Sequence, residues 1–362
     1  MEANRVDLDL TLEGNKIAII SGTRPEAIKL APVYLALKEL GADVEYIHTG
    51  QHGELHDQVT EFFNISRVTK LAWSSHHKDL PSLCSQMFVQ INEVLREKKF
   101  SCVVVQGDTA SAFCGANVAY LNQIPVCHIE AGLRSGWRSE PFPEEAFRKM
   151  ISVITDIHFC PTEGARNNLI KEGIDRDSIH VTGNTVIDAV RIATETHQDI
   201  SRIANELGSK LFATLSNASF VLMTVHRREN HGDRLEDICD AMKLFCEQSE
   251  THILCPVHPN PNVKDRVVSA LSSTANVHLV PALTYQSLIW ALRSCKFIVS
   301  DSGGLQEEAP SVQKRILILR DQTERPEIVE SGWGDLIGVT TDRVVNSMLR
   351  LDQHLFERRV IS

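Results

Sequence analysis

Short apolar runs alternate with longer amphipathic stretches along most of the chain. The stretches, such as Leu80–Glu97 and Leu235–Glu247, repeat apolar residues at helical spacing. Continuous apolar strands that alternate with helices are typical of parallel sheets covered on both faces. We therefore predict an α/β protein. Its expected strands are Ile17–Ile20, Val44–Ile47, Val103–Val105, Val126–Ile129, Ile157–Phe159, Phe220–Val225, Ile253–Val257, Val277–Val280, Phe297–Val299 and Ile316–Leu319.

The number of expected strands indicates two domains. Ten strands are many for one open sheet, and a length of 362 residues is typical of more than one domain. The segment Thr185–Leu215 is helical and polar, with a turn at Leu207-Gly208-Ser209. We place the junction near Val181–Thr185 and predict domains of residues 1–183 and 184–362.

Composition and charge exclude several kinds of partner. The formal charge is −10, without a basic block, which is unfavourable for binding nucleic acid. No apolar run reaches the roughly 18 residues of a membrane-spanning helix, and the first 15 residues lack the apolar core of a signal peptide. The nine cysteines form no Cys-x-x-Cys pair, which is typical of buried free thiols. We expect a cytoplasmic protein that binds neither nucleic acid nor membranes.

Polar motifs follow six of the expected strands, at the end where parallel sheets bind ligands. Each motif alone could be an ordinary helix cap, but six of them in both halves favour a shared cleft between two domains. The motifs are Gly22-Thr23-Arg24-Pro25-Glu26, Gln106-Gly107-Asp108, Glu130-Ala131-Gly132, His226-Arg227-Arg228-Glu229, His258-Pro259-Asn260 and Asp301-Ser302-Gly303-Gly304.

Two of these motifs predict binding of an anion. Arg24 and Lys29 bring two cations to the start of a helix, although surface charge on a capped helix is the alternative interpretation. In the last motif, glycines let backbone N–H groups approach a phosphate, while Ser302 caps a helix or binds an oxygen. It is neither a Walker loop nor a dinucleotide fingerprint. Glu308, one turn further, could accept from ribose hydroxyls.

Acidic residues near the strand ends of the first domain suggest acid–base chemistry. Carboxylates that share a partly closed cleft have their pKa values pushed apart, giving one acid and one base. Asp108, Glu130 and Glu144 are the candidates, although Glu144 could simply open a helix whose dipole favours acids. His226 and His258 could bind a metal, but no paired spacing supports such a site, and we predict none.

Taken in order, the motifs resemble the UDP-N-acetylglucosamine 2-epimerase family, and the likeness runs from about Lys16 to Arg350. Such enzymes have two Rossmann-like domains facing a deep cleft, the architecture of glycosyltransferase-B enzymes. The matching strings are Gly-Thr-Arg-Pro-Glu-Ala-Ile-Lys (22–29), Gly-Asp-Thr (107–109), His-Ile-Glu-Ala-Gly-Leu-Arg (128–134), Pro-Glu-Glu (143–145), Thr-Gly-Asn-Thr-Val-Ile-Asp-Ala (182–189), His-Arg-Arg-Glu-Asn (226–230), Pro-Val-His-Pro-Asn-Pro (256–261) and Asp-Ser-Gly-Gly-Leu-Gln-Glu-Glu-Ala-Pro (301–310).

The resemblance implies interconversion of UDP-GlcNAc and UDP-ManNAc. A proton leaves sugar carbon 2 while UDP leaves carbon 1, and 2-acetamidoglucal and UDP are retained. UDP then adds back, with a proton delivered to the opposite face of carbon 2. The resemblance implies a UDP-sugar substrate and no cofactor, and we also expect a homodimer.

Motif matching gives each candidate residue a role. Asp108, Glu130 and Glu144 become the acid–base set in the first domain, and His226 lies near the diphosphate and assists its departure. The second domain becomes the one that binds UDP. The residues expected to bind the UDP-sugar are Arg24, Lys29, Arg134, His258, Ser302, Gly303, Gly304, Glu308 and Arg325.

One segment departs from the family pattern. Bacterial members often carry Gln-His-Arg-x-Met-Leu-Asp-Gln after the second strand, where a second substrate molecule activates the enzyme. Residues 51–58 here read Gln-His-Gly-Glu-Leu-His-Asp-Gln, so the arginine and methionine are replaced. We therefore expect no requirement for an activator.

Three alternative functions stay open at this point. The departure from the activator pattern raises the hydrolysing variant of the family, which releases UDP and free ManNAc. A glycosyltransferase of the same architecture would need an acceptor site, and three acids speak against it because such enzymes rely mainly on one base. A UDP-sugar-binding protein without activity is suggested only by the missing final helix of the family.

Overall fold

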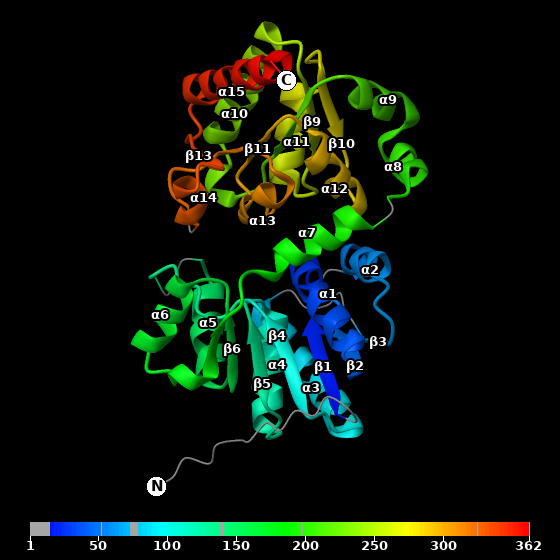
Figure 1. The fold of residues 1–362 in the computed structure, drawn as a ribbon, viewed down its shortest axis with the longest axis vertical. Helices are drawn as coiled ribbons and strands as arrows, with labels where there is room; N and C mark the ends of the chain where they lie inside the picture. The colour runs from blue at the N-terminus through cyan, green and yellow to red at the C-terminus, as the bar shows by residue number, and fades with distance from the viewer. Residues whose placement is uncertain are drawn as a thin grey trace. The chain divides into compact units, whose positions relative to one another are not determined.

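The computed structural model describes residues 15–51, 53–72, 79–137, 141–196, 198–323 and 325–361. The chain forms two compact units, residues 1–189 and 190–362, and the boundary falls within helix α7 (Thr185–Glu195). Each unit is built on one parallel sheet flanked by helices (Figure 1). The predicted α/β class with two Rossmann-like domains is confirmed. No helix among the described residues combines the length and apolar character needed to cross a membrane.

The described part of the N-terminal unit has a seven-stranded sheet in the order β3-β2-β1-β4-β5-β6-β7, with every pair parallel. The chain moves outward from β1 in one direction and then returns to continue in the other, which places a topological switch point between β1 and β4. Its elements are β1 (Lys16–Ser21), α1 (Arg24–Glu39), β2 (Asp43–His48), α2 (Gly53–Phe62), β3 (Val68–Lys70), α3 (Leu80–Lys98), β4 (Cys102–Gln106), α4 (Ala110–Leu121), β5 (Val126–Ile129), α5 (Glu144–Val153), β6 (Ile157–Cys160), α6 (Glu163–Lys171) and β7 (Ile179–Val181).

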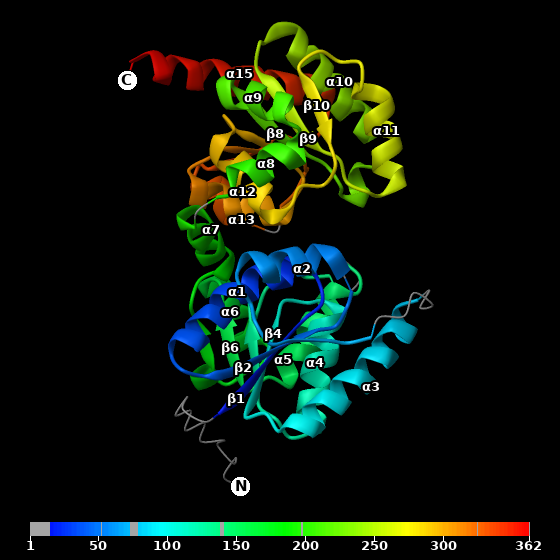
Figure 2. The ribbon, with the colours of Figure 1, turned by 90° about the vertical axis from the view of Figure 1, so that its right-hand side faces the viewer.

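Helices cover both faces of this sheet. Helices α3, α4 and α5 pack on one face, and α1 and α2 lie on the other, as right-handed crossovers require (Figure 2). Met87, Ile91 and Leu95 of α3, spaced four residues apart, are buried in this core, whereas Val89 on the same helix is exposed. The larger members of this core are Ile20, Ile47, Leu71, Met87, Ile91, Leu95, Phe100, Phe147 and Ile151.

The C-terminal unit has a second parallel sheet, whose described strands follow the order β10-β9-β8-β11-β12-β13. β8 and β11 are neighbours although 73 residues separate their ends, which brings two distant polar motifs to one edge. The elements are α8 (Ile200–Leu207), α9 (Ser209–Asn217), β8 (Phe220–Thr224), α10 (Asp233–Gln248), β9 (His252–Pro256), α11 (Pro261–Leu271), β10 (Val277–Val280), α12 (Tyr285–Ser294), β11 (Ile298–Ser300), α13 (Gly303–Glu308), β12 (Ile316–Ile318), α14 (Pro326–Glu330), β13 (Gly334–Leu336) and α15 (Thr341–Ile361).

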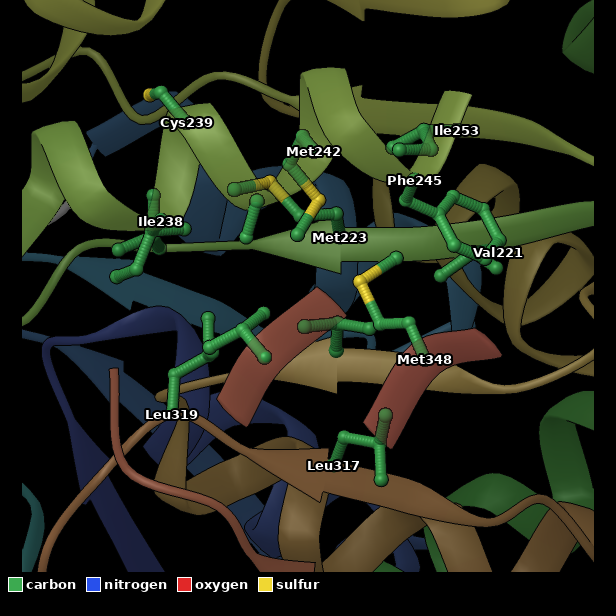
Figure 3. Packing of buried hydrophobic residues seen from close by; sticks show 14 of the residues in the cluster. Val221, Met223, Ile238, Cys239, Met242, Phe245, Ile253, Leu317, Leu319 and Met348 are labelled. Carbon is green, nitrogen blue, oxygen red and sulfur yellow. The ribbon is translucent and has the colours of Figure 1, made fainter. Parts of the chain in front are cut away.

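The core of the C-terminal unit lies between its sheet and helices α10, α11 and α15. Met242 and Phe245 of α10 and Met348 of α15 pack against Val221 and Met223 of β8 (Figure 3). All five side chains are almost completely buried. Burying side chains of this size contributes roughly 1.5–3 kcal/mol each, so this core holds the polar strand ends in place.

All ten strands expected from the sequence are present, each within one residue of its expected limits. Three strands were missed: β3, β7 and β13, each of three residues at an edge of its sheet. An edge strand pairs on one side only and can carry polar residues, so it lacks the continuous apolar run that marks a central strand. All nine cysteines are free thiols, and seven of them are buried, as predicted.

Candidate active site

The turn between β1 and α1 is tightly packed and is fixed by hydrogen bonds. A Cβ at Gly22 would lie 2.1 Å from the hydroxyl oxygens of both Ser111 and Thr49, so only glycine fits. Thr23 caps α1, and Glu26 completes a capping box by accepting from the Thr23 backbone N–H at 2.8 Å. Glu26 also accepts from the Thr109 hydroxyl at 2.6 Å. The Gly-Thr-Arg-Pro-Glu turn is therefore tied to the Gly-Asp-Thr turn that follows β4.

Burial raises the pKa of Glu26 to about 7 from its usual 4.5, against hydrogen bonds from Thr109, Thr23 and Gly22 that lower it. Between pH 4.5 and about pH 7, Glu26 of the folded protein therefore keeps a proton that the same group has already released in the unfolded chain. The stability that this proton contributes is complete below pH 4.5 and is lost as the pH rises through 7, and it amounts to about 3 kcal/mol.

Glu26→Gln imitates the protonated carboxyl group, so the variant should gain stability relative to the original chain as the pH rises. We expect a relative gain of up to about 3 kcal/mol between pH 4.5 and pH 8, measured by urea unfolding at several pH values. Glu39→Gln, at the exposed end of the same helix, is the matched control and should show no such trend. A pH-independent difference for Glu26→Gln would contradict the raised pKa.

Glu130 is held by three side chains of the N-terminal unit. Its Oε1 lies 2.5 Å from the ammonium group of Lys29, and its Oε2 accepts from the Gln106 amide. Asn184 donates to Oε1 at 3.4 Å. The backbone φ of Glu130 is +65°, a left-handed conformation that is uncommon for a residue other than glycine and that collects at functional sites. The structure thus brings two predicted site residues, Lys29 and Glu130, into direct contact.

Asp108 forms a second carboxylate–cation pair in the same unit. Its Oδ2 lies 2.5 Å from the guanidinium group of Arg148 on α5, which also contacts Glu145 at 3.2 Å. Burial lowers the pKa of Arg148, but Asp108, Glu145 and Glu130 outweigh it and raise that pKa. Sequence reasoning missed Arg148. The spacing of Glu145 and Arg148, three residues apart on one helix, was the available signal.

Glu144 begins α5, as the helix-opening interpretation predicts. Its Oε2 is buried and accepts no hydrogen bond from any residue that the structure describes. A buried carboxylate oxygen usually has a partner, so a ligand hydroxyl or amide would satisfy it. No direct contact joins Glu144 to Asp108 or Glu130 among the described residues.

Two predicted substrate-binding arginines differ in their surroundings. Arg134 makes a bidentate pair with Glu172, the residue that caps the end of α6, at 2.9 and 2.6 Å, and donates to the Ser152 hydroxyl at 3.0 Å. These contacts connect α5 and α6 and account for its position without a substrate. Arg24 is the first residue of α1 and is partly exposed. The role of both residues in binding a UDP-sugar stays a prediction.

In the C-terminal unit, the buried Asp301 side chain holds the histidine motif, residues 226–230, in place through several contacts. The carboxylate is fully buried and accepts from the backbone N–H groups of His226 and Arg227 at 3.0 and 2.9 Å. The Asn230 amide donates to it at 3.0 Å, and His226 Nδ1 lies 3.2 Å away. Burial raises the pKa of Asp301, but the contacts from His226 and Arg227 outweigh it, and the pKa lies below its usual value.

The glycine turn after β11 lies against two arginines. Ser302 caps α13 by accepting from the Leu305 N–H at 3.4 Å. A Cβ at Gly303 would lie 2.7 Å from the guanidinium group of Arg325 and 3.1 Å from that of Arg227. Arg325 was predicted and Arg227 was not, although it lies within the histidine motif. Two guanidinium groups beside a glycine turn favour a phosphate or diphosphate.

His258 follows β9 and lies beside His226. The two rings stack with centroids 5.7 Å apart and an interplanar angle of 21°. Burial and the neighbouring His226 lower the pKa of His258. Its Nδ1 accepts from the Asn260 N–H at 3.2 Å, so Nε2 carries the proton of the neutral ring. Glu308 is buried at the end of α13.

The chain matches known proteins over nearly its whole length. The sequence model for the UDP-N-acetylglucosamine 2-epimerase family matches residues 36–360. The UDP-N-acetylglucosamine 2-epimerase of Neisseria meningitidis serogroup A is 39% identical over 341 residues, which cover 94% of this chain and 91% of that protein. It is therefore a full-length relative.

Solved structures agree with this match. A crystal structure of UDP-GlcNAc 2-epimerase from Neisseria meningitidis bound to UDP-GlcNAc has a TM-score of 0.86 at 38% identity, covering 93% of this chain and 91% of that one. The enzyme from Methanocaldococcus jannaschii in complex with UDP-GlcNAc and UDP has a TM-score of 0.78 at 32% identity, covering 93% and 92%.

The resemblance drawn from the motifs is confirmed by these matches. They extend over both sheets, and the motifs that carried the resemblance form the two sets of polar contacts described above. The chain belongs to the UDP-N-acetylglucosamine 2-epimerase family.

Proposed function

We propose that this chain is a non-hydrolysing UDP-N-acetylglucosamine 2-epimerase that interconverts UDP-GlcNAc and UDP-ManNAc. The observation that carries the proposal is the partly buried Lys29–Glu130 pair, in the same unit as the Asp108–Arg148 pair. The solved relatives bound to UDP-GlcNAc support a UDP-sugar as the substrate.

The N-terminal unit supplies the acid–base groups. Inverting carbon 2 needs one group that removes a proton from one face and another that returns a proton to the opposite face. The proton at carbon 2 is weakly acidic, so each group needs a fixed position. Lys29 and Gln106 hold Glu130, and Arg148 holds Asp108. Glu144 provides a third carboxylate.

The reaction balances without an oxidant or reductant. The base takes the proton at carbon 2, the electron pair of that bond forms a double bond to carbon 1, and the bond from carbon 1 to the diphosphate oxygen breaks. UDP leaves with the electron pair of the broken carbon–oxygen bond, and 2-acetamidoglucal remains. Addition of UDP to carbon 1, with a proton delivered to the other face of carbon 2, gives the epimer.

The C-terminal unit stabilises the leaving group. Arg227 and Arg325, beside Gly303, bind the diphosphate and offset the charge that develops on it. Asp301 holds the His226 ring through Nδ1. With Nδ1–H directed at Asp301, Nε2 donates to a phosphate oxygen only in the imidazolium form, which carries a proton on both nitrogens. Glu308 accepts hydrogen bonds from the ribose.

Proton NMR of UDP-GlcNAc incubated with the protein in deuterated water tests this function. We expect deuterium at carbon 2 of the sugar and the appearance of UDP-ManNAc. If the substrate stays unlabelled and unchanged at high enzyme concentration, the catalytic proposal is wrong. Glu130→Gln serves as the matched control, because it keeps the shape of the site and should label far more slowly.

The same spectra separate the alternatives. Free ManNAc and UDP as the main products would identify the hydrolysing reaction instead. The glycosyltransferase alternative predicts no labelling at carbon 2. The homodimer and the cytoplasmic location expected from the sequence stay predictions.

A further inference from the structure

Three potential metal ligands meet at the end of β2, apart from the acid–base pairs. His48 is the last residue of β2, and His56 and Asp57 are neighbours on α2. One ligand atom from each of the three residues lies within 4.8 Å of the other two. None of the three has a role in the function proposed above.

The two histidines form a buried stack. His48 and His56 are 2% and 0% exposed, and their ring centroids lie 3.6 Å apart with an angle of 8° between the planes. The stack holds the two rings next to each other, and a rotation of one ring is needed for nitrogens of both to face one ion. Imidazole nitrogen with carboxylate oxygen is a ligand set that suits zinc and similar divalent transition metals.

The surrounding groups orient the ligands as a metal site requires. His56 Nε2 is hydrogen-bonded to the Ser21 hydroxyl at 2.6 Å, and that hydroxyl contacts the Tyr46 hydroxyl at 2.9 Å. Nδ1 of His56 would therefore be its ligand atom. Metal-binding histidines usually have the other ring nitrogen fixed by an outer partner in this way.

The carboxylate of Asp57 lies between His48 and Lys70. Its Oδ1 lies 3.8 Å from His48 Nδ1, and its Oδ2 accepts from Lys70 at 2.8 Å. Ligand atoms around tetrahedral zinc lie about 3.3 Å apart, since each bond is about 2.0–2.1 Å long. Closing the site brings the three ligand atoms together from separations of up to 4.8 Å, and Lys70 is exposed enough to turn away into water.

We propose that His48, His56 and Asp57 bind one divalent cation of the zinc class and fasten α2 to the end of β2. Three protein ligands would leave a fourth position for water. His56 is a departure of this chain, because the bacterial family pattern quoted above has leucine at that place. The proposal does not depend on the epimerase function.

Titration of the untagged, chelator-treated full chain with Co²⁺ and then Zn²⁺ tests the site. We expect one equivalent to bind, with the visible absorption of tetrahedral Co²⁺ and its loss on adding Zn²⁺. Zinc at 100 times its dissociation constant should also raise the melting temperature, by about 5 °C or more.

Two variants and one control locate the ion. His56→Leu, which restores the family residue, and Asp57→Asn should each weaken binding by about 10-fold or more. His278→Gln is the matched control, since it removes one ring of another histidine pair, joined to His252 at 2.9 Å. It should leave one equivalent bound. Absence of the Co²⁺ absorption, or unchanged affinity in a folded His56→Leu or Asp57→Asn variant, would overturn the proposal.

Discussion

Replacing Glu130 by glutamine is expected to lower kcat by about 10²–10⁴-fold, the usual contribution of one general acid or base. Glutamine preserves the size of the side chain and its oxygen can still accept from Lys29, but it cannot take a proton from carbon 2. UDP binding should stay within a few-fold, because the contacts proposed for the diphosphate and the ribose come from residues of the C-terminal unit. Single-turnover kinetics together with UDP titration separate the two effects.

Glu163→Gln provides the comparison for this experiment. Glu163 is also a carboxylate paired with a cation in the N-terminal unit, but its partner Arg166 has no role in the proposed reaction. Its replacement should leave kcat nearly unchanged. Near-normal turnover of the Glu130→Gln variant would remove Glu130 from the catalytic set.

Asp301→Ala is expected to destabilise the C-terminal unit by about 4 kcal/mol or more. The backbone N–H groups of His226 and Arg227 and the amide of Asn230 would lose a buried acceptor, and each unsatisfied buried group costs about 1–3 kcal/mol. Hydrogen exchange measured by mass spectrometry is the appropriate readout, because peptides from the N-terminal unit act as an internal reference.

Asp301→Asn should cost less, since one oxygen remains to accept. The original chain should also lose this contribution in acid: the pKa of Asp301 is lowered by folding, so its stabilisation is present above the unfolded pKa and disappears as the pH falls through the folded one. Unchanged exchange in the C-terminal unit of Asp301→Ala would show that the histidine motif is held by other contacts.

The sequence was a good guide wherever the physical signal is local. The ten predicted strands follow from apolar runs, and the start of α1 follows from Thr23, Pro25 and Glu26, which are neighbours in the chain. The contact between Asp301 and His226 could not be read in this way. It depends on β11 lying beside β8, and no short pattern encodes which strand pairs with which.

The missed site residues have the same explanation. Arg148 contacts Asp108 across 40 positions, and Arg227 meets the glycine turn only because two strand ends adjoin. Lys29 and Glu130 were each proposed from their own motifs, but their contact spans 101 positions. Residue types and strand ends were therefore predictable, whereas the partners that fix each side chain were not.

The buried thiols can report when each of the two units unfolds. Burial raises the pKa of Cys160 to about 11 and that of Cys255 and Cys295 to about 12, so at neutral pH these sulfurs are neither exposed nor nucleophilic. An alkylating reagent can react with them only when the surrounding core opens. Since Cys160 belongs to one unit and the other two to the second, the mass of each alkylated peptide would time the opening of the two halves separately in a single sample.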